Sequence, residues 1–264
     1  MRTNIRGIEA GVLAMALGAM ITSLSWAMRA RADVALDEAQ DYENRVEFGY
    51  LSEDAKALRA LIRTLGALAE EDDGDPRAHY LAAHADYRLA LVLDATHRPD
   101  AEDAAKACLE ELTALTRRDS RDVEAFVQKA ACHGFLAGNS VIKGVTHGPA
   151  AGDAVAVALR LAPKNPRAHL VDALVDYWRS GKHGDDRAQV FEKFKQAAEF
   201  FEALPPGSSE FPSWGSADVY YWLGTSYIDR GDVAAARSAL EQALIVAPDF
   251  AAVRRQLVRL STPR

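Results

Sequence analysis

The stretch of sequence that most constrains the fold lies near the C-terminus, over residues 217–250. Bulky residues at Tyr220, Leu223 and Tyr227 recur every three or four positions, and Gly224 lies among them. Residues with this spacing share one face of a helix. Because a small residue on that face lets a second helix approach closely, the pattern predicts a tightly packed helical hairpin.

The second helix of this hairpin is bounded by a turn and a proline. Gly231 ends the first helix, because glycine readily takes the left-handed conformation found at helix C-termini. An apolar stripe with helical spacing follows, at Ala236, Leu240, Ala243 and Leu244. Pro248 ends the second helix because proline cannot continue the backbone hydrogen-bond ladder.

These landmarks resemble those of a tetratricopeptide repeat (TPR). The stretch is 34 residues long, which is the period of that family. The residue types typical of the family stand at Tyr220, Leu223, Gly224, Tyr227, Ala236, Leu240, Ala243 and Pro248. The resemblance implies helical hairpins stacked into a superhelix that holds other molecules. Over about the last hundred residues, the chain is most similar to exported bacterial proteins of this repeat type.

Less regular copies of the pattern lie upstream. Residues 75–88 and 165–179 share the letters Pro-Arg-Ala-His, a small residue and Asp-Tyr. The small landmark recurs at Ala83, Ala130, Ala173 and Gly224, with spacings of 47, 43 and 51 residues. Spacings longer than the family period predict insertions, which we place at residues 94–99, 138–148, 180–186 and 205–216. We interpret residues 205–216 as a polar spacer at the surface.

We therefore predict an all-α fold, a TPR-like α-solenoid of about four hairpins with additional terminal helices. Residues 33–264 would form this single repeat domain, with its clearest repeat at 217–250 and a capping helix over 251–260.

Residues 1–32 differ in character from the rest of the chain. Two arginines precede a charge-free apolar run over residues 10–28, and Ala30 and Ala32 form a small-x-small cleavage site. These features predict a signal peptide cleaved after Ala32, and a periplasmic or otherwise exported protein. Because the run is also about long enough to span a bilayer, an N-terminal inner-membrane anchor is the alternative.

The charge and the cysteines narrow the classes of function. The formal net charge is −7, and loss of residues 1–32, with four arginines and one glutamate, makes it −10. A chain this acidic is not expected to bind nucleic acid. In an oxidising compartment, Cys108 and Cys132 on consecutive predicted helices either form a disulfide or are two small buried side chains.

No pattern in the sequence predicts catalysis. The histidines form no His-x-x-x-His pair, and the chain has no Cys-x-x-Cys. Ser140 and Lys143 match the Ser-x-x-Lys form of some acyl enzymes, but the companion motifs of those enzymes are missing. We predict a chain that is not an enzyme, with no catalytic residue, no cofactor and no metal site.

The TPR resemblance instead implies a binding groove lined by the first helix of each hairpin. The positions three before and one, four and five after each small landmark are expected to face this groove. From this counting, together with two arginines near the edge, we predict a partner-binding groove at Arg77, Tyr80, His84, Tyr87, Arg88, Arg167, Tyr177, Trp178 and Tyr221. Tyr, Trp and Arg are enriched at binding hot spots, which favours a binding surface. Packing of these aromatic side chains on neighbouring repeats or long loops is the alternative.

These observations favour a non-catalytic protein-binding or scaffolding module of the bacterial cell envelope, with a protein or peptide as partner. One alternative is a solute-binding or ligand-binding helical-repeat component of an uptake system. Another is a membrane-anchored assembly factor, which requires that residues 10–28 are retained and contact the membrane. The sequence does not specify the oligomeric state.

Overall fold

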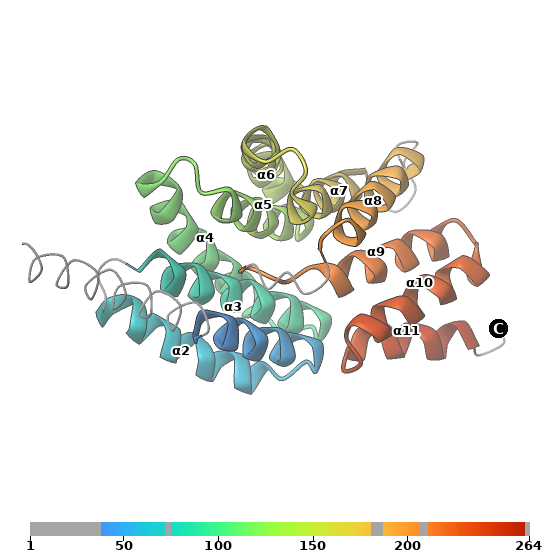
Figure 1. Cartoon of the computed structure of the whole chain (residues 1–264), viewed down its shortest axis with the longest axis horizontal. Coiled ribbons are helices and arrows are strands. Elements are labelled where there is room, and N and C mark those ends of the chain that lie inside the picture. The colour runs from blue at the N-terminus through green and yellow to red at the C-terminus, as the bar shows by residue number, and fades with distance from the viewer. Residues whose placement is uncertain (1–37, 72–74, 181–186, 206–210, 262–264) are drawn as a thin grey trace, which may run out of the picture. The chain divides into compact units, whose positions relative to one another are not determined.

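Helices follow one another through the part of the chain that the computed structural model describes, residues 38–71, 75–180, 187–205 and 211–261. No strand occurs in these ranges (Figure 1). The bounds are α2 Ala55–Glu71, α3 Pro76–Ala95, α4 Ala101–Arg118, α5 Val123–Gly138, α6 Val141–Leu161, α7 Pro166–Ser180, α8 Arg187–Glu202, α9 Ser216–Asp229, α10 Val233–Val246 and α11 Ala251–Ser261.

The chain divides into two units, residues 1–41 and 42–264. In the first unit, residues 38–41 are helical, and the predicted signal peptide over 1–32 lies outside the described residues. In the second unit, helical residues 42–51, called the leading helix below, precede α2. Among the described helices, none is both long enough and apolar enough to cross a bilayer.

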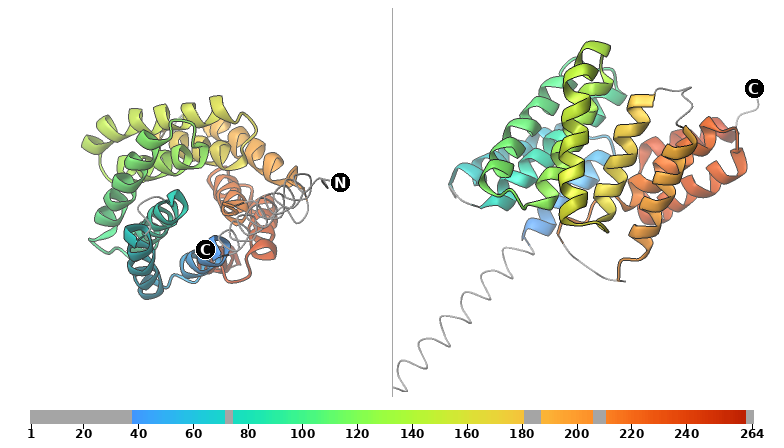
Figure 2. Two further views of the ribbon diagram at one scale, coloured as in Figure 1. Left: turned by 60° about the vertical axis from the view of Figure 1, so that its left-hand side comes forward. Right: turned by 90° about the horizontal axis from the view of Figure 1, so that it is seen from above.

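The helices of the second unit pack as successive hairpins. The leading helix is followed by α2, and then α3 pairs with α4, α5 with α6, α7 with α8, and α9 with α10. Figure 2 shows these hairpins side by side in chain order. The last helix, α11, packs against α10. The predicted all-α TPR-like array is therefore confirmed.

Aspartates at the helix starts explain why the elements begin where they do. Asp75, Asp122 and Asp232 each accept a hydrogen bond from a backbone N–H in the first turn of α3, α5 or α10, at 2.9 to 3.0 Å. Such a cap satisfies a donor that the helix itself leaves without a partner. Gly231, between α9 and α10, has φ +78°, the left-handed conformation expected for it.

Small landmark residues set the distance between the helices of a hairpin. A Cβ atom added at Gly224 would lie 2.8 Å from Leu240 Cγ and 3.3 Å from the carbonyl oxygen of Ala236. The equivalent Ala83, Ala130 and Ala173 are all buried. The first helix of each of these hairpins therefore carries a small residue on a buried face, and at Gly224 this position lies directly against the second helix.

The insertion predicted at residues 138–148 is mostly helical and is not a long loop. Helix α6 begins at Val141 and continues through Pro149. The Ser140 hydroxyl accepts a hydrogen bond from the Lys143 N–H at 3.2 Å, which caps the helix. Its first turns pack on α5, where His133 and His147 meet with their Nδ1 atoms 2.9 Å apart. This packing stabilises a segment whose glycines disfavour helix.

The interpretation of residues 205–216 as a polar spacer is wrong for residues 211–215, called the inner strap below. Only 4% of Trp214 is exposed, and its indole N–H donates to the Tyr80 hydroxyl at 2.9 Å. The backbone N–H of Ser213 donates to the Glu43 carboxylate at 2.9 Å. Phe211 and Trp214 hold this segment inside the array, because large aromatic side chains bury much apolar surface.

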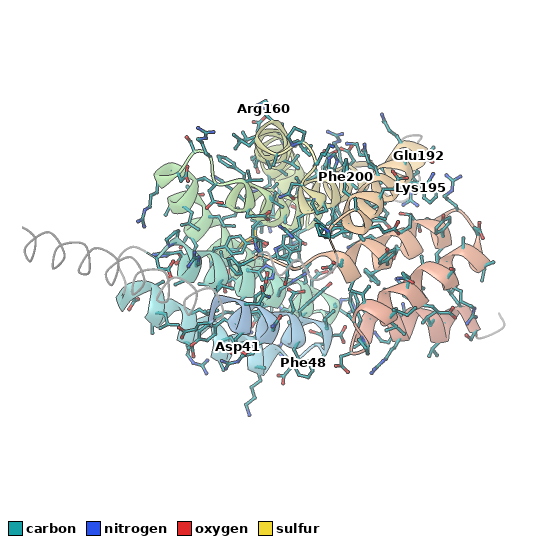
Figure 3. All side chains as sticks on the ribbon, viewed as in Figure 1. Asp41, Phe48, Arg160, Glu192, Lys195 and Phe200 are labelled. Carbon is teal, nitrogen blue, oxygen red and sulfur yellow. A yellow bond between two sulfur atoms is a disulfide. The ribbon has the colours of Figure 1, made fainter. Side chains whose placement is uncertain are left out.

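A disulfide joins Cys108 of α4 to Cys132 of α5. Of the two alternatives for these cysteines, the structure has the bonded pair. Figure 3 shows Arg160, Glu192 and Lys195 on the outer sides of α6 and α8.

Candidate functional site: an inner aromatic cavity

The inner faces of α3, α5, α7 and α9 surround a cavity of about 290 Å³, called the inner cavity below. The leading helix, the inner strap and the start of α11 complete its walls. Its aromatic lining consists of Tyr50, Tyr87, Phe135, Trp178, Trp214, Tyr221, Trp222 and Phe250. The charged residues of the lining are Glu53, Arg88, Asp94 and Asp218. Clefts with a largely apolar lining and a few polar groups are typical of ligand sites.

A buried ion-pair cluster forms one wall of the inner cavity. The Arg88 side chain is 1% exposed, and its guanidinium donates to Glu47 at 2.7 and 2.9 Å and to Asp218 at 2.7 Å. The Tyr50 hydroxyl also donates to Asp218, at 2.9 Å, and the Arg88 guanidinium lies 4.0 Å from the centre of the Tyr50 ring. Both carboxylates thus share one guanidinium, which links the leading helix, α3 and α9.

The Glu47 carboxylate stays ionised in this cluster. Burial by itself raises the pKa of Glu47, but the charge of Arg88 and the hydrogen bonds from His84 and Arg88 outweigh burial and lower the pKa to about 2. A buried pair of this kind stabilises the fold only while both partners are present, because removing one leaves an uncompensated charge.

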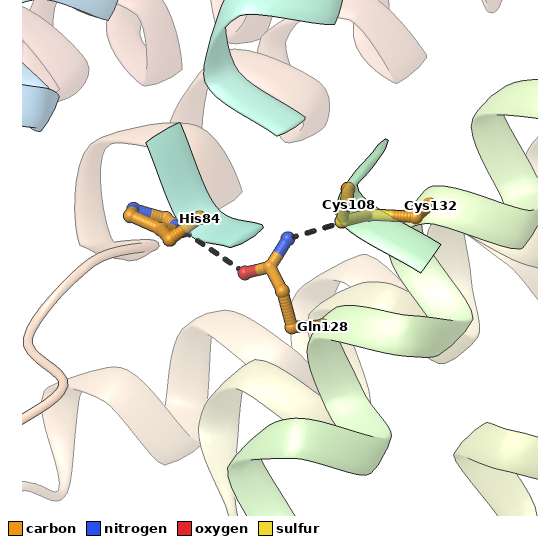
Figure 4. The surroundings of a disulfide bond; sticks show 4 residues. All are labelled: His84, Cys108, Gln128 and Cys132. Atoms are coloured by element: carbon orange, nitrogen blue, oxygen red, sulfur yellow. Dashed lines mark hydrogen bonds between the residues drawn. A yellow bond between two sulfur atoms is a disulfide. The ribbon is translucent and has the colours of Figure 1, made fainter. Parts of the chain in front are cut away.

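His84 extends the cluster toward the disulfide (Figure 4). Its Nε2 lies 2.8 Å from a Glu47 oxygen, and its Nδ1 lies 3.0 Å from Gln128 Oε1. Gln128 Nε2 in turn lies 4.0 Å from the sulfur of Cys132. The Trp214 ring stacks on the imidazole, with the ring centres 5.4 Å apart. The network therefore connects α5 to the wall of the cavity.

Contacts between the beginning and the end of the second unit close the inner cavity. The Tyr50 ring meets the Phe250 ring edge to face, with the centres 5.6 Å apart. Arg255 of α11 forms an ion pair with Glu53, which follows the leading helix. These contacts join residues about two hundred positions apart in sequence, and they place the leading helix across one side of the cavity.

Comparison with solved structures identifies the fold. The structure of TTC0263, a thermophilic TPR protein in Thermus thermophilus, is similar to this chain with a TM-score of 0.59. The sequences are 18% identical over 83% of this chain and 98% of that chain. This protein has a TPR-like fold. No protein-family model matches the sequence, and no curated protein matches it.

Two further structures are less similar to this chain. The MamA RS-1 ArsTM double mutant has a TM-score of 0.37 at 12% identity, over 83% of this chain and 96% of that chain. The Cut9–Hcn1 hetero-tetramer of APC/C has a TM-score of 0.39 at 14% identity, over 83% of this chain and 42% of that chain.

The fold brings four of the predicted groove residues to the inner cavity: Tyr87, Arg88, Trp178 and Tyr221. Trp178 is the most accessible of them, with 47% of its surface exposed. Tyr87 and Arg88 are buried, so in this conformation their side chains shape the wall of the cavity and do not reach the outer surface.

The remaining predicted residues lie outside the inner cavity of the TPR-like array. Tyr80 and His84 are buried against Trp214 of the inner strap. Arg167 donates to both carboxylate oxygens of Glu124, at 2.9 and 2.8 Å. Tyr177 is buried and donates to Asp229 at 3.0 Å, and Arg77 lines a shallow hollow beside Phe211. Contacts within the protein thus occupy the side chains of Tyr80, His84, Arg167 and Tyr177.

Several residues that line the inner cavity were not predicted from the sequence, although the repeat position of one of them was a usable signal. Phe135 lies five positions after the small landmark Ala130, where Arg88 lies relative to Ala83. The counting rule would have found it. Tyr50 and Phe250 carried no such signal, because they reach the cavity through contacts between the two ends of the unit.

A second hollow of about 940 Å³, called the outer groove below, lies between α5, α6 and α7. Val141 and Val145 border it with exposed fractions of 88% and 73%. Trp178 lines both the outer groove and the inner cavity, so this side chain forms a wall between them. Within the described residues, no three metal-ligating side chains lie together.

Proposed function

We propose that this chain is a non-catalytic binding protein of the bacterial cell envelope. Its TPR-like array would hold a protein or peptide at the opening around Trp178, where the inner cavity meets the outer groove. The observation that carries this proposal is a half-exposed tryptophan at the junction of the inner cavity and the outer groove. Exposed tryptophan beside an apolar hollow is typical of a binding hot spot.

In this proposal, the predicted groove residues have two roles. Trp178 and Tyr221 contact the partner, because both are at least partly accessible. Arg88, Tyr80 and His84 hold the inner helices, the leading helix and the inner strap in place around the contact site. Rigid support of a few accessible aromatic side chains lowers the entropy cost of binding.

The location in the cell envelope is the second part of the proposal. It rests on the sequence of residues 1–32, which has the charge, apolar run and small-residue site of a signal peptide. The bonded pair Cys108–Cys132 supports it, because disulfides persist mainly in oxidising compartments. N-terminal sequencing of the protein from its host should find Asp33 as the first residue. An intact N-terminus would favour the membrane-anchored assembly factor.

Site-specific photo-crosslinking in the native host tests the partner-binding proposal. A photoreactive phenylalanine replaces Trp178 in the full chain, and a matched variant carries it at Ile245, which is 72% exposed on α10. We expect a discrete crosslinked protein from position 178 and none of the same mass from position 245. Identical adducts from both positions, or none from position 178, would refute partner binding at this opening.

The inner cavity favours a second candidate function, a solute-binding component of an uptake system. The leading helix and the inner strap partly enclose the cavity, as expected of a site for a small molecule rather than for an extended peptide. Its volume of about 290 Å³ is close to the lower end of the range for ligand pockets.

A further inference from the structure

The geometry points to a small organic cation, an alkylammonium group, as the ligand of the inner cavity. This inference deepens the proposed function and rests on its assignment of the opening around Trp178 as the binding site. It follows from the charges, the aromatic lining, one hydroxyl group and the size of the cavity.

The charges that line the inner cavity favour a cation. Glu53, Asp94 and Asp218 are acidic and Arg88 is basic, so the charged lining residues carry a formal charge of −2. Inclusion of their ion-pair partners Glu47 and Arg255 leaves this sum unchanged. The Arg88 guanidinium is not available to an anion, because two carboxylates already bind it. A low-dielectric cavity with this charge attracts cations and repels anions.

The aromatic lining provides ring faces that bind cations. Trp222 meets Trp178 at an interplanar angle of 82° with the ring centres 5.5 Å apart, and it meets Tyr221 at 72° and 5.4 Å. Steeply inclined neighbouring rings form adjoining walls of the same hollow. Cations bind to such faces through the ring quadrupole, and quaternary ammonium groups are recognised by aromatic cages of this kind.

The Tyr87 hydroxyl supplies a polar contact for the ligand. Tyr87 is buried and lines the inner cavity, and the described residues give its hydroxyl no hydrogen-bond partner. Burial raises the pKa of Tyr87, so the hydroxyl keeps its proton and can donate to or accept from a ligand. A ligand with an N–H or O–H group would hydrogen-bond to this hydroxyl where Tyr87 lines the cavity.

The size of the inner cavity limits the ligand. A volume of 290 Å³ corresponds to about ten water molecules of about 30 Å³ each. This space accommodates a small amine or one cationic side chain, and it excludes a folded segment of a partner. The alkylammonium group therefore comes from one of two sources, a free solute or a lysine side chain of the partner.

Titration of the protein purified from its host, followed by tryptophan fluorescence, tests the charge preference. The probes are choline, its neutral isostere 3,3-dimethylbutan-1-ol and the anion 3,3-dimethylbutanoate. We expect choline to bind at least about tenfold more tightly than the neutral isostere, since a cation gains a contact with the ring faces that the neutral group lacks. The anion should not bind. Equal binding of choline and the neutral isostere, or no binding of choline, would overturn the inference.

Two variants and a control assign choline binding to the inner cavity. Trp178→Leu should weaken it about tenfold through loss of a ring face. Asp94→Asn, at an exposed position of the lining, should weaken it about two- to fivefold. The matched control Asp103→Asn removes one exposed acid from α4, outside the cavity, and should leave the affinity unchanged. If all three variants bind choline like the wild type, the ligand binds elsewhere and the inference falls.

Competition between choline and the photo-crosslinked partner at position 178 distinguishes the two sources of the alkylammonium group. It also separates the cation inference from the protein-binding proposal. If choline binds and suppresses the crosslink, the cation is a side chain of the partner. Choline binding in the absence of any crosslinked partner would assign the cavity to a free solute and refute the protein-binding proposal alone. A crosslinked partner with no choline binding would refute the cation inference alone.

Discussion

The substitution Gly224→Ala tests whether helix contact sets the small landmark of each hairpin. The added Cβ would lie 2.8 and 2.9 Å from two carbons of Leu240, and 3.3 Å from the backbone carbonyl oxygen of Ala236. Leu240 is fully buried, so its side chain cannot turn out into solvent. The two helices must therefore move apart to accommodate one methyl group.

The magnitude follows from two opposing contributions. Overpacking of a buried contact costs about 1–3 kcal/mol, whereas replacing glycine by alanine in a helix gains about 0.5–1 kcal/mol. The difference spans about 0–2.5 kcal/mol, and because two contacts are shorter than 3.0 Å we expect Gly224→Ala to lower the free energy of unfolding by about 1–2 kcal/mol. Gly66→Ala in α2 is the matched control, because nothing lies within 4 Å of its added Cβ. That variant should gain about 0.5–1 kcal/mol.

Urea unfolding followed by circular dichroism at 222 nm measures both variants, since loss of helix reports unfolding directly. A double-mutant cycle with Leu240→Ala isolates the contact. Leu240→Ala alone should cost about 2–5 kcal/mol. In that background, Gly224→Ala should become neutral or stabilising, because the clashing side chain is gone. If Gly224→Ala is as stable as the wild type in the presence of Leu240, close helix approach is not the reason for the glycine.

Three further predictions concern the buried polar and aromatic residues. Burial, with the charge of Glu111, raises the pKa of Asp86 from 3.8 to about 7, so folding favours its protonated form and stability is lost as the pH rises from about 4 to 7. Asp86→Asn should therefore stabilise the protein at pH 8, by at most about 4 kcal/mol, and the gain should shrink toward pH 4 in urea unfolding. A gain that is independent of pH would contradict this. Arg88→Ala leaves Glu47 and Asp218 without their cation and should cost about 3–5 kcal/mol, measured by the same method; a loss below about 1 kcal/mol would mean that the cluster is not buried as described. Trp214→Ala should lower the thermal midpoint markedly, at a cost of about 3–5 kcal/mol, whereas a shift typical of a surface position would show that the inner strap does not pack inside.

Some of the residues that face the inside of the array were predictable, because their direction depends on their position within the repeat. The landmarks Ala83, Ala173 and Gly224 give the register of the first helices, and this register correctly placed Trp178 and Tyr221 at the inner cavity. Whether an inner residue is accessible was not predictable in the same way. Arg88 faces inward as expected, but the leading helix and α9 bury it.

The inner strap shows why a segment between repeats is difficult to interpret. Residues 205–216 contain prolines and serines typical of a surface spacer, together with Phe211 and Trp214. The two aromatic residues were the signal of burial. The sequence offered no indication of where they insert, because their shared partner Tyr80 lies more than one hundred positions away.

Most of the helices, their pairing into hairpins and the small residues at their contacts could be read from the sequence. These features depend on interactions between residues close in the chain: caps such as Asp75, helical spacing of apolar side chains, and small residues such as Gly224. Which inner residues surround a cavity and which are buried could be seen only in the tertiary structure. That outcome depends on contacts such as Tyr50 with Phe250 and Arg88 with Asp218, which form only after the hairpins have stacked and brought distant parts of the chain together.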